Sequence, residues 1–435
     1  MALLKQSLSA LTSKGCQNRL WNRVAASCRG FHSPIIDITT DKGLALPPDP
    51  KTFPDYKPRD FFSFELLHES SISRARVGRI YTPHGFVDTP GFVAVATNGA
   101  LKAVDHRAAD DSGQQLMFCN TYHLLLQPGP KLIEKAGGIH KYMNRNRPII
   151  TDSGGFQVFS LSQGSVTDEL NMKARGPNRS TEGSLLDEVS ELGAKFRSYR
   201  DGKQHLLTPE SSVEAQKAYG SDIIVPLDEL PPYHIERRRL ESSVYLTHRW
   251  EARSLRAHLN NVKNQAMYGV IHGGVDLELR QLSIDYISSL PFDGFGVGGS
   301  LGKDRNELIQ LLNFVMPRLD PKRPNHLLGI ADIESIKRAV PLGVDTFDSC
   351  FPTRMGRHGT LLTQNGPLKI RKNSNRNNYK PPDEKFGLQN VSVAYLHYLS
   401  KEHLPLAGSL MTLHNIKYMN DFMSDLRSKI MRDEI

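Results

Sequence analysis

Hydrophobic and polar positions follow two different patterns along this chain. In residues 61–91 apolar and polar side chains alternate around Pro83-His84-Gly85, which is the period of half-buried strands joined by a turn. Beyond residue 91, short continuous apolar runs recur, and several segments between them, such as 306–315, have helical periodicity. The first pattern predicts a small antiparallel hairpin sheet, and the second predicts parallel strands connected by crossover helices.

Eight apolar runs of strand length follow the hairpin region. They cover residues 92–97, 116–119, 148–151, 223–227, 267–271, 294–297, 326–330 and 346–347. This strand count and the length of the segment predict an α/β fold of the (β/α)8 TIM-barrel type, with a doubly wound open sheet as the alternative. Polar residues or glycines follow the runs, as expected where the βα loops of a barrel form a single active-site face.

The loop after the third run combines a carboxylate, two glycines and an aromatic ring. Its sequence is Asp152-Ser153-Gly154-Gly155-Phe156. Glycines let a planar ligand approach the backbone closely, and the phenyl ring offers a stacking face for a base. An aspartate that caps a helix beside a tight turn would give the same sequence, so that interpretation stays open.

A second cluster follows the eighth run. It places Asp348 at the strand end and Arg354 and Arg357 beyond a proline turn, while Asp228 follows the fourth run. Carboxylates on different barrel strands can face each other across a pocket, where one attacks a sugar carbon and the other transfers protons. Arginines outside such a pocket suit phosphates, and Asp228 is an acceptor suited to the N–H groups of a guanine edge.

Part of the formal charge of +9 lies in a basic leader segment at the start of the chain. Residues 1–33 contain five Lys or Arg and no acid, with leucines at helical spacing, which is typical of a mitochondrial transit peptide. A disordered tail or a chloroplast signal would have a similar composition. Residues 34–60 are rich in proline and aspartate and indicate a linker, after which we expect one barrel unit over 61–425.

The other concentration of positive charge lies at the C-terminal end. Residues 350–435 hold 13 Lys and Arg against 7 Asp and Glu, a net of +6, so residues 34–349 carry −2. The densest basic stretch contains Lys369, Arg371 and Lys372. Such a patch suits a phosphate backbone, although a solvated basic loop has the same composition.

Cysteine content and hydropathy exclude several classes of protein. The chain has 4 cysteines and no C-x-x-C pair, which excludes a disulfide scaffold and a cysteine-rich zinc knuckle. No apolar run reaches the roughly 18 residues that a membrane span requires, so we expect no integral membrane segment.

At these residues the chain resembles a known family, the tRNA-guanine transglycosylases, and most closely their eukaryotic members. The matching stretches run in family order from about residue 63 to 420 and are Asn120-Thr-Tyr-His-Leu, Thr151-Asp-Ser-Gly-Gly-Phe-Gln157, Leu227-Asp-Glu229, Gly298-Gly299, Phe347-Asp348, Pro352-Thr-Arg354 and His414-Asn415. The family fold is a (β/α)8 barrel, in agreement with the strand count.

The resemblance implies a pentosyltransferase of queuosine biosynthesis. Family members remove guanine from the wobble position of tRNAs with G-U-N anticodons, and eukaryotic members insert queuine. The aspartate matching Asp348 is the family's nucleophile, and the one matching Asp152 is its general acid/base. The residues implied to contact the base are Ser153, Gly154, Gly155, Phe156, Asp228, His272, Gly298, Gly299 and Gly302. Arg354 and Arg357 match tRNA contacts, to which we add the basic residues Lys369, Arg371 and Lys372.

Two departures from the family pattern stand out. The family carries a C-x-C-x-x-C zinc cluster, but residues 382–388 contain no cysteine, and only His414 of the ligand set remains. We therefore predict a degenerate zinc subdomain at about 365–420 that holds no metal, and no other cofactor. His272 stands where the family holds the base with a glutamine, whose paired amide geometry an imidazole cannot copy.

Several alternatives stay open at this point. A non-catalytic partner subunit of the same heterodimeric enzyme would also depart from the family at these positions, and an RNA-binding barrel or a sugar hydrolase would share parts of the pattern. We expect a homodimer or a heterodimer with a homologous subunit, with tRNA and queuine as further partners. The leader predicts a mitochondrial location, with cytoplasmic or outer-membrane-associated protein as the alternative.

Overall fold

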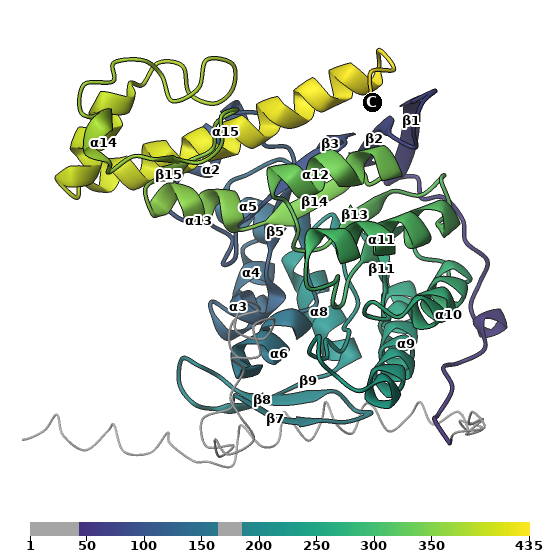
Figure 1. Ribbon diagram of the computed structural model, residues 1–435. Helices are drawn as coiled ribbons and strands as arrows, with labels where there is room; N and C mark the ends of the chain where they lie inside the picture. The colour runs from purple at the N-terminus through teal and green to yellow at the C-terminus, as the bar shows by residue number, and fades with distance from the viewer. Residues whose placement is uncertain (1–42, 164–184) are drawn as a thin grey trace, which may run out of the picture. The chain divides into compact units, whose positions relative to one another are not determined.

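The computed structural model of the chain describes residues 43–163 and 185–435, and the predicted leader at 1–33 lies outside this range. Eight parallel strands close into a barrel (Figure 1). Around the barrel they are β4 (Gly91–Val95), β5 (Met117–Cys119), β6 (Ile149–Thr151), β10 (Ile223–Ile224), β11 (Ala266–Ile271), β12 (Gly294–Val297), β13 (Asn325–Leu327) and β14 (Thr346–Ser349), which pairs again with β4. Each strand overlaps one of the eight predicted runs, so the predicted TIM barrel is confirmed.

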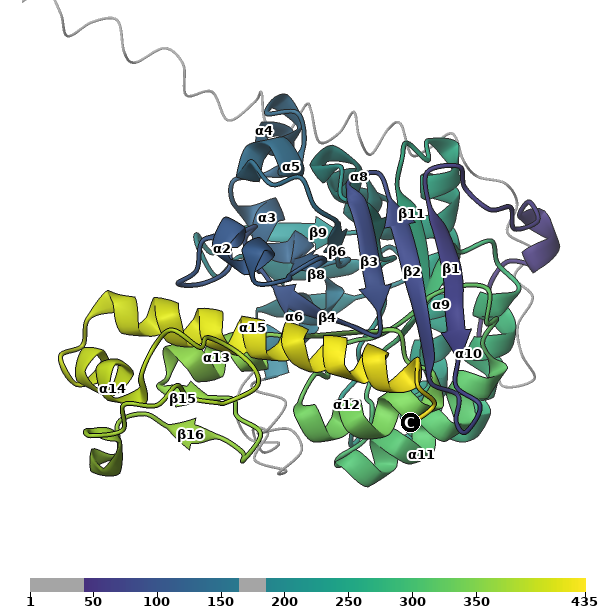
Figure 2. The same cartoon turned by 90° about the horizontal axis from the view of Figure 1, so that it is seen from above.

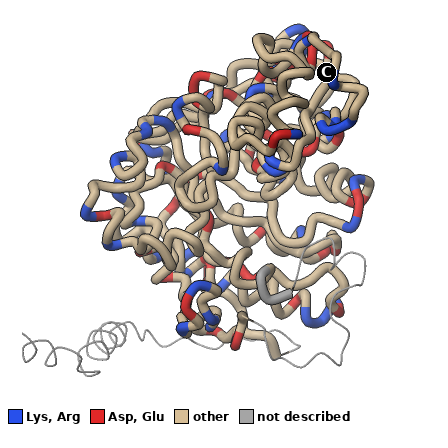
Figure 3. The backbone as a smooth tube through the Cα atoms, turned by 90° about the vertical axis from the view of Figure 1, so that its left-hand side faces the viewer, with Lys and Arg blue, Asp and Glu red and all other residues tan. Residues whose placement is uncertain are grey.

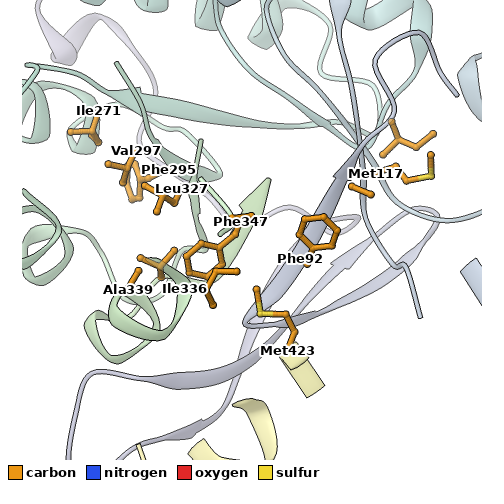
Figure 4. Packing of buried hydrophobic residues seen from close by; sticks show 14 of the residues in the cluster. Phe92, Met117, Ile271, Phe295, Val297, Leu327, Ile336, Ala339, Phe347 and Met423 are labelled. Carbon is orange, nitrogen blue, oxygen red and sulfur yellow. The ribbon is translucent and has the colours of Figure 1, made fainter. Parts of the chain in front are cut away.

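The barrel strands form continuous apolar runs because both of their faces are buried. Val93, Phe118 and Ile150 belong to a cluster inside the barrel, while the alternate residues of the same strands belong to a larger cluster between strands and helices. Figure 4 shows part of the second cluster, in which strand residues such as Phe347 pack with side chains of the surrounding helices. Parallel sheets covered on both faces require this pattern.

The crossover helices begin with side-chain caps at several places. Asp276, Asp304 and Asp332 each accept hydrogen bonds from backbone N–H groups at the start of a helix. Among the described residues, no helix is long and apolar enough to cross a membrane. The helices are α2 (His106–Asp111), α3 (Thr121–Leu126), α4 (Pro130–Lys135), α5 (Ile139–Met143), α6 (Gly155–Gln163), α8 (Pro209–Tyr219), α9 (Arg237–Asn260), α10 (Leu277–Ser288), α11 (Arg305–Val315), α12 (Ile333–Ala339), α13 (Phe351–Arg357), α14 (Val393–Lys401) and α15 (Pro405–Ile430).

The predicted N-terminal hairpin sheet is also confirmed. It consists of the antiparallel strands β1 (Ser63–Glu69), β2 (Arg76–Thr82) and β3 (Gly85–Thr89). Three buried aspartates at the amino ends of barrel strands hold this sheet and the segment before it in place. The contacts are a hydrogen bond between His84 and Asp222 and the ion pairs of Arg59 with Asp293 and Arg76 with Asp345.

A second antiparallel sheet lies between β6 and α8. The hydrophobic pattern of the sequence does not predict it. Its strands are β7 (Leu186–Val189), β8 (Ala194–Arg197) and β9 (Gln204–Leu207). Its inner face joins Tyr122 and Trp250 in a small apolar cluster. The strands are short and only partly alternating, which explains why their pattern was not recognised.

The C-terminal region packs against the barrel through one long helix. Figure 2 shows α15 running alongside α13, close to the hairpin of β15 (Thr360–Leu361) and β16 (Leu368–Lys369). Gly356 of α13 permits the close approach, because a Cβ there would lie 2.7 Å from the Cα of Thr412. The helix continues to Ile430, beyond the predicted unit boundary at 425.

Candidate active site

The carboxyl ends of six barrel strands carry the side chains that the sequence singled out. Parallel strands of a closed barrel end on one rim, so these residues share a single face of the protein. In order around the rim they are Asn120 after β5, Asp152 after β6, Asp228 beyond β10, His272 after β11, Gly298 and Gly299 after β12, and Asp348 in β14.

Asp152 is the most strongly perturbed carboxyl group on this rim. It is only 9% exposed. One of its oxygens accepts the backbone N–H groups of Thr121 at 2.7 Å and Gly154 at 3.1 Å, and the other accepts the amide of Asn120 at 2.6 Å. Burial raises the pKa of Asp152 to about 6 despite these hydrogen bonds, which favour the ionised form. The group can therefore exchange a proton near neutral pH.

Asp348 lies in a different environment at the end of β14. Its Oδ1 accepts a hydrogen bond from the backbone N–H of Gly329 at 2.7 Å and lies 3.0 Å from Nε2 of His326. Asp152 thus accepts hydrogen bonds from Asn120, Thr121 and Gly154 and from the side chain of Gln157, whereas Asp348 is held by one backbone donor and one imidazole. Two carboxyl groups with such different surroundings suit two different chemical roles.

Asp228 lies between the two other strand-end loops and contacts both. Its Oδ1 accepts a hydrogen bond from Oγ of Ser153 at 3.4 Å, and its Oδ2 lies 2.9 Å from Nε2 of His272. Gly155 brings the loops together, because a Cβ at this residue would lie 2.9 Å from the carbonyl oxygen of Asp228. Gly154 has a φ of +86°, a backbone conformation that favours glycine.

A cavity of about 280 Å³ opens beside this cluster. His272, Gly299 and Ser300 belong to its lining, together with residues that precede and begin α9. Gly299 has a φ of +72°, and a Cβ there would lie 2.9 Å from Nδ1 of His272. Gly302 is not among the lining residues. It forms the turn before α11, where a Cβ would lie 2.7 Å from Cβ of Glu307.

Phe156 lies at the start of α6 and is 47% exposed. A half-exposed ring in the loop that carries Asp152 is available for stacking on a planar ligand. Gly298, directly after β12, is buried, and a Cβ there would lie 2.6 Å from a methyl group of Val270. Packing against Val270 therefore also requires a glycine at this position.

The predicted tRNA-binding residues occupy two elements. Arg354, which is exposed, and Arg357, which is half-buried, lie in α13, directly after β14 and Asp348. The other three residues, Lys369, Arg371 and Lys372, are exposed at and after β16. Basic and acidic positions are interspersed over the rest of the described chain (Figure 3).

The region of the family's zinc cluster is closed by hydrogen bonds in this chain. Nδ1 of His414 accepts the N–H of Leu388 at 3.1 Å, and Nε2 contacts the carbonyl oxygen of Leu362 at 3.0 Å. Gly387 lies directly against this imidazole. Both ring nitrogens are thus engaged, and no thiolate accompanies them, so the residues present do not fit a tetrahedral zinc site.

One other group of residues among those described has a metal-ligand composition, namely His84, His140 and Asp222. Asp222 directly precedes β10, so the group lies at the opposite end of the barrel from the active-site rim. The two imidazoles stack with a centroid distance of 3.5 Å, and each contacts one oxygen of Asp222. Parallel rings both aimed at a carboxylate form a hydrogen-bonded cluster that fastens the N-terminal hairpin.

Sequence reasoning missed the partners of the two carboxyl groups. The motif that contains Asn120 does not reveal its contact with Asp152, although the position of Asn120 directly after a strand indicates a side chain on the rim. His326 falls within an apolar run, where a histidine in a barrel strand indicates a polar contact in the interior. Gly329 contributes only its backbone N–H to Asp348, and no sequence pattern predicts such a contact.

Known proteins are similar to this chain over most of its length. The sequence profile of the family described as queuine tRNA-ribosyltransferase matches residues 71–435. A protein of that name from Protochlamydia amoebophila (strain UWE25) is 53% identical over 378 residues, which cover 86% of this chain and 97% of the relative. Another of that name, from Chlamydia felis (strain Fe/C-56), is 48% identical over 376 residues, or 86% of this chain and 99% of the relative.

The barrel, its carboxylate-bearing rim and these relatives together define a TIM-barrel glycosyltransferase of the pentosyltransferase class. Its general activity is tRNA-guanine transglycosylation, the exchange of a base in tRNA. The chain belongs to the queuine tRNA-ribosyltransferase family.

Proposed function

We propose that this enzyme replaces guanine with queuine at the wobble position of tRNAs with G-U-N anticodons, through a covalent ribosyl intermediate on Asp348. The observation that carries this proposal is the pair of buried carboxyl groups on one rim, Asp152 and Asp348, with different surroundings. An oxygen of Asp348 attacks C1′ of the wobble ribose, and the C1′–N9 bond to guanine breaks. Queuine then attacks C1′ from the opposite side and displaces Asp348, so that two inversions give net retention.

Asp152 moves the protons in both half-reactions. In its protonated form it gives a proton to the departing guanine, and the resulting carboxylate takes one from N9 of the incoming queuine. A pKa of about 6 supports this role, because such a group is partly protonated at the pH of most cellular compartments. The proton balance closes over one exchange, since the second half-reaction restores the first state.

The remaining rim residues recognise the base. Asp228 and Ser153 hold the N–H edge of the purine, while Phe156 stacks on its face and His272 contributes one hydrogen bond. The close backbone at 154–155 and 298–299 fits a flat ligand. The adjoining cavity of about 280 Å³ offers room for the side group of queuine, and the small Gly302 keeps the following turn tight.

Base incorporation tests the proposal directly. Purified protein is incubated with radiolabelled queuine or guanine and an unmodified tRNA with a G-U-N anticodon. Wild type should incorporate label, and Asp348→Asn should reduce incorporation by at least about 10³-fold, because a nucleophile cannot be bypassed. A tRNA with adenine at the wobble position is the substrate control. Incorporation that survives Asp348→Asn would remove Asp348 as the nucleophile.

A partner subunit is the second possibility that specific residues favour. His272 and the altered loop at 382–388 depart from the family at functional positions, as a subunit with relaxed constraints would. The incorporation assay is therefore repeated with homologous chains from the same organism. Activity that appears only in the mixture and survives Asp348→Asn in this chain would support a non-catalytic partner subunit. Activity in the mixture that requires Asp348 of this chain would make this chain the catalytic subunit of an obligate heterodimer.

The location and the metal content are part of the proposal. The basic, acid-free residues 1–33 support mitochondrial import, with a cytoplasmic or outer-membrane-associated enzyme as the alternative. Fusion of these residues to a fluorescent protein, with Arg19 and Arg23 replaced by glutamate in the control, distinguishes the locations.

Because the residues around His414 do not fit zinc, we propose that the C-terminal region folds without a metal.

A further inference from the structure

Asp348 is held by the protein at one of its two oxygens. Oδ1 contacts both the backbone N–H of Gly329 and Nε2 of His326, at 2.7 and 3.0 Å. Among the residues that the structure describes, no hydrogen bond reaches Oδ2. The two oxygens are therefore unequal: Oδ1 faces the protein, and Oδ2 is the one that a substrate can reach.

His326 is itself fixed at both ring nitrogens. It lies in β13 with its side chain only 1% exposed, and its ring stacks on Phe118 of β5 at a centroid distance of 5.9 Å. Nδ1 lies 2.8 Å from Oγ1 of Thr346 on β14. The imidazole cannot rotate without losing both polar contacts, so its direction toward Asp348 is set by the barrel.

The direction of the hydrogen bond follows from the charge of Asp348. An ionised carboxylate has no hydrogen to donate, so Nε2 must carry the hydrogen and donate it to Oδ1. Oγ1 of Thr346 can serve either state of the ring, because a hydroxyl both donates and accepts. It lies 3.1 Å from the carbonyl oxygen of Asn325, to which its own hydrogen can turn when Nδ1 is the donor.

We propose that His326 is a positioning residue for Asp348, whose Nε2–H holds Oδ1, aims Oδ2 at the ribose and stabilises the carboxylate as it leaves. This inference rests on the proposed role of Asp348 as nucleophile. In the first half-reaction Oδ2 forms a bond to C1′ while the bond to guanine breaks. In the second, the C1′–Oδ2 bond breaks and its electron pair returns to the carboxylate, whose negative charge is shared with Oδ1.

This role makes the two half-reactions unequally sensitive to His326. A donor on Oδ1 stabilises the carboxylate that departs in the second half-reaction, whereas in the first it both aligns the attacking group and stabilises it before attack. Loss of the donor should therefore slow the resolution of the covalent intermediate more than its formation. A residue that only filled space would not change this ratio.

Two substitutions separate the donor from the bulk of the ring. His326→Phe keeps an aromatic ring of similar size without a donor, and His326→Gln keeps an amide N–H that reaches the position of Nε2. For the Phe variant we expect kcat to fall about 10- to 100-fold, the range for a lost hydrogen bond to a charged group. The KM for tRNA should stay within about twofold, and the Gln variant should recover most of the rate.

The intermediate supplies the second readout. Each variant is mixed with tRNA, quenched at timed intervals and run on a denaturing gel, and queuine is then added to chase the protein–tRNA adduct. The Phe variant should form the adduct yet release it about 10- to 100-fold more slowly than wild type, and the Gln variant should release it at nearly the wild-type rate. Equal rates in wild type and the Phe variant, or equal losses in both variants, would overturn the proposal.

Failure of this inference can be told apart from failure of the proposed function. Asp348→Asn should give no adduct at all, and an adduct in that variant would mean that the nucleophile itself was misassigned. If His326→Phe does not fold, as judged by its thermal unfolding, His326→Asn replaces it. The asparagine amide reaches only the position of Nδ1, beside Thr346, so it should behave as a variant without the donor.

Discussion

At the scale of single residues, burial gives Asp152 a protonation behaviour that an exposed aspartate lacks. Its pKa is raised to about 6 by burial, while Asn120, Thr121 and Gly154 stabilise the ionised form. The balance of these effects determines the pH range in which the residue can give a proton to guanine. Each partner can therefore be tested by the direction in which its removal moves that range.

Replacing Asn120 with alanine should move the pH dependence of the enzyme upward. Protonated Asp152 is required for guanine departure. In wild type, kcat/KM for tRNA should therefore fall tenfold per pH unit above about pH 6, and this fall is the descending limb of the pH profile. Asn120→Ala removes a hydrogen bond that favours the ionised form, so the pKa rises. The limb should then move up by about one pH unit. Initial rates of guanine exchange between pH 5 and 8 measure it.

Thr121→Val is the matched control for this experiment. Thr121 contacts Asp152 through its backbone N–H alone, which valine retains. Its hydroxyl has no hydrogen-bond partner among the described residues. The limb of this variant should coincide with that of wild type, and a limb that stayed fixed in Asn120→Ala would contradict the assignment.

Replacement of His272 should change the KM for the free base more than the KM for tRNA. Nε2 of this histidine lies 2.9 Å from Oδ2 of Asp228, the residue proposed to hold the base, and His272 lines the cavity. His272→Ala should raise the KM for the free base about tenfold, the value of one hydrogen bond, and change the KM for tRNA little. Steady-state rates at varied base concentration check this.

Val275 provides a comparison at the same cavity. It lines the cavity and is 41% exposed, but its side chain offers no hydrogen bond. Val275→Ala should leave the KM for guanine unchanged, and equal effects of the two substitutions would show that His272 acts only by filling space.

At the scale of elements, the contact between α13 and α15 links the active site to the C-terminal region. α13 begins three residues after Asp348 and carries Arg354, and its Gly356 lies against the backbone of α15 at Met411 and Thr412. Asn415 of α15 also donates to the carbonyl oxygens of Pro352 and Thr360. Displacement of α15 should therefore disturb the loop that carries the nucleophile.

Gly356→Ala should destabilise the protein by about 1–3 kcal/mol, the usual cost of an added methyl group in a packed interface. The new Cβ would lie 2.7 Å from the Cα of Thr412, and backbone cannot yield as a flexible side chain can. Gly408→Ala in α15 is the control, because beyond the helix's own backbone no atom of the described residues lies within 4 Å of its Cβ position. There the helix propensity of alanine should stabilise the protein by up to about 1 kcal/mol. Urea denaturation compares the two, and equal effects would contradict the packing argument.

Asp383 organises the loop that lacks the family's cysteines. Its oxygens accept the backbone N–H groups of Gln364, Lys385 and Phe386, and Phe386 packs on Tyr418. Burial alone would raise the pKa of Asp383, but these donors outweigh burial and lower it. Its stabilising effect is therefore present above its unfolded pKa and is lost as the pH falls through the folded one.

Removal of Asp383, not removal of metal, should loosen this loop. Asp383→Ala should cost about 1–3 kcal/mol at pH 7, because three backbone donors lose their acceptor. A chelator should leave the melting temperature of wild type unchanged. Glu384→Ala is the control, since that side chain is 83% exposed and its nearest cation lies 3.8 Å away. About one zinc per chain by metal analysis would contradict the proposal of a metal-free loop.

At the scale of the whole molecule, the positive charge is concentrated where tRNA is expected. Residues 34–349 carry −2 and residues 350–435 carry +6, which include both α13 and the basic residues after β16. Lys372→Ala should lower the magnitude of the slope of log affinity against log salt by about 0.7–0.9, the value for one lost phosphate contact. Lys337→Ala, whose lysine pairs with Glu334 on α12, should leave the slope unchanged. Filter binding at several salt concentrations measures both slopes, and equal slopes in all three proteins would place the tRNA elsewhere.

The barrel can be predicted from the residue pattern, because a parallel sheet buried on both faces requires continuous apolar runs, and the sequence contains eight of them. The same pattern also indicates that Asp152, Asp228, His272 and Asp348 share one rim, since every parallel strand ends on the same side. The sheet of β7, β8 and β9 escaped prediction, because short, partly exposed strands carry little periodic signal.

The surroundings of each of these groups depend on the folded chain. Asn120 and Asp152 are separated by 32 positions in the sequence yet form a 2.6 Å contact, and His326 reaches Asp348 from a neighbouring strand. Desolvation and hydrogen-bond direction depend on every element that packs around a carboxyl group, and a pattern of residue types along the chain does not contain that information. The pKa of Asp152, the unequal oxygens of Asp348 and the closed loop at Asp383 therefore follow from the fold.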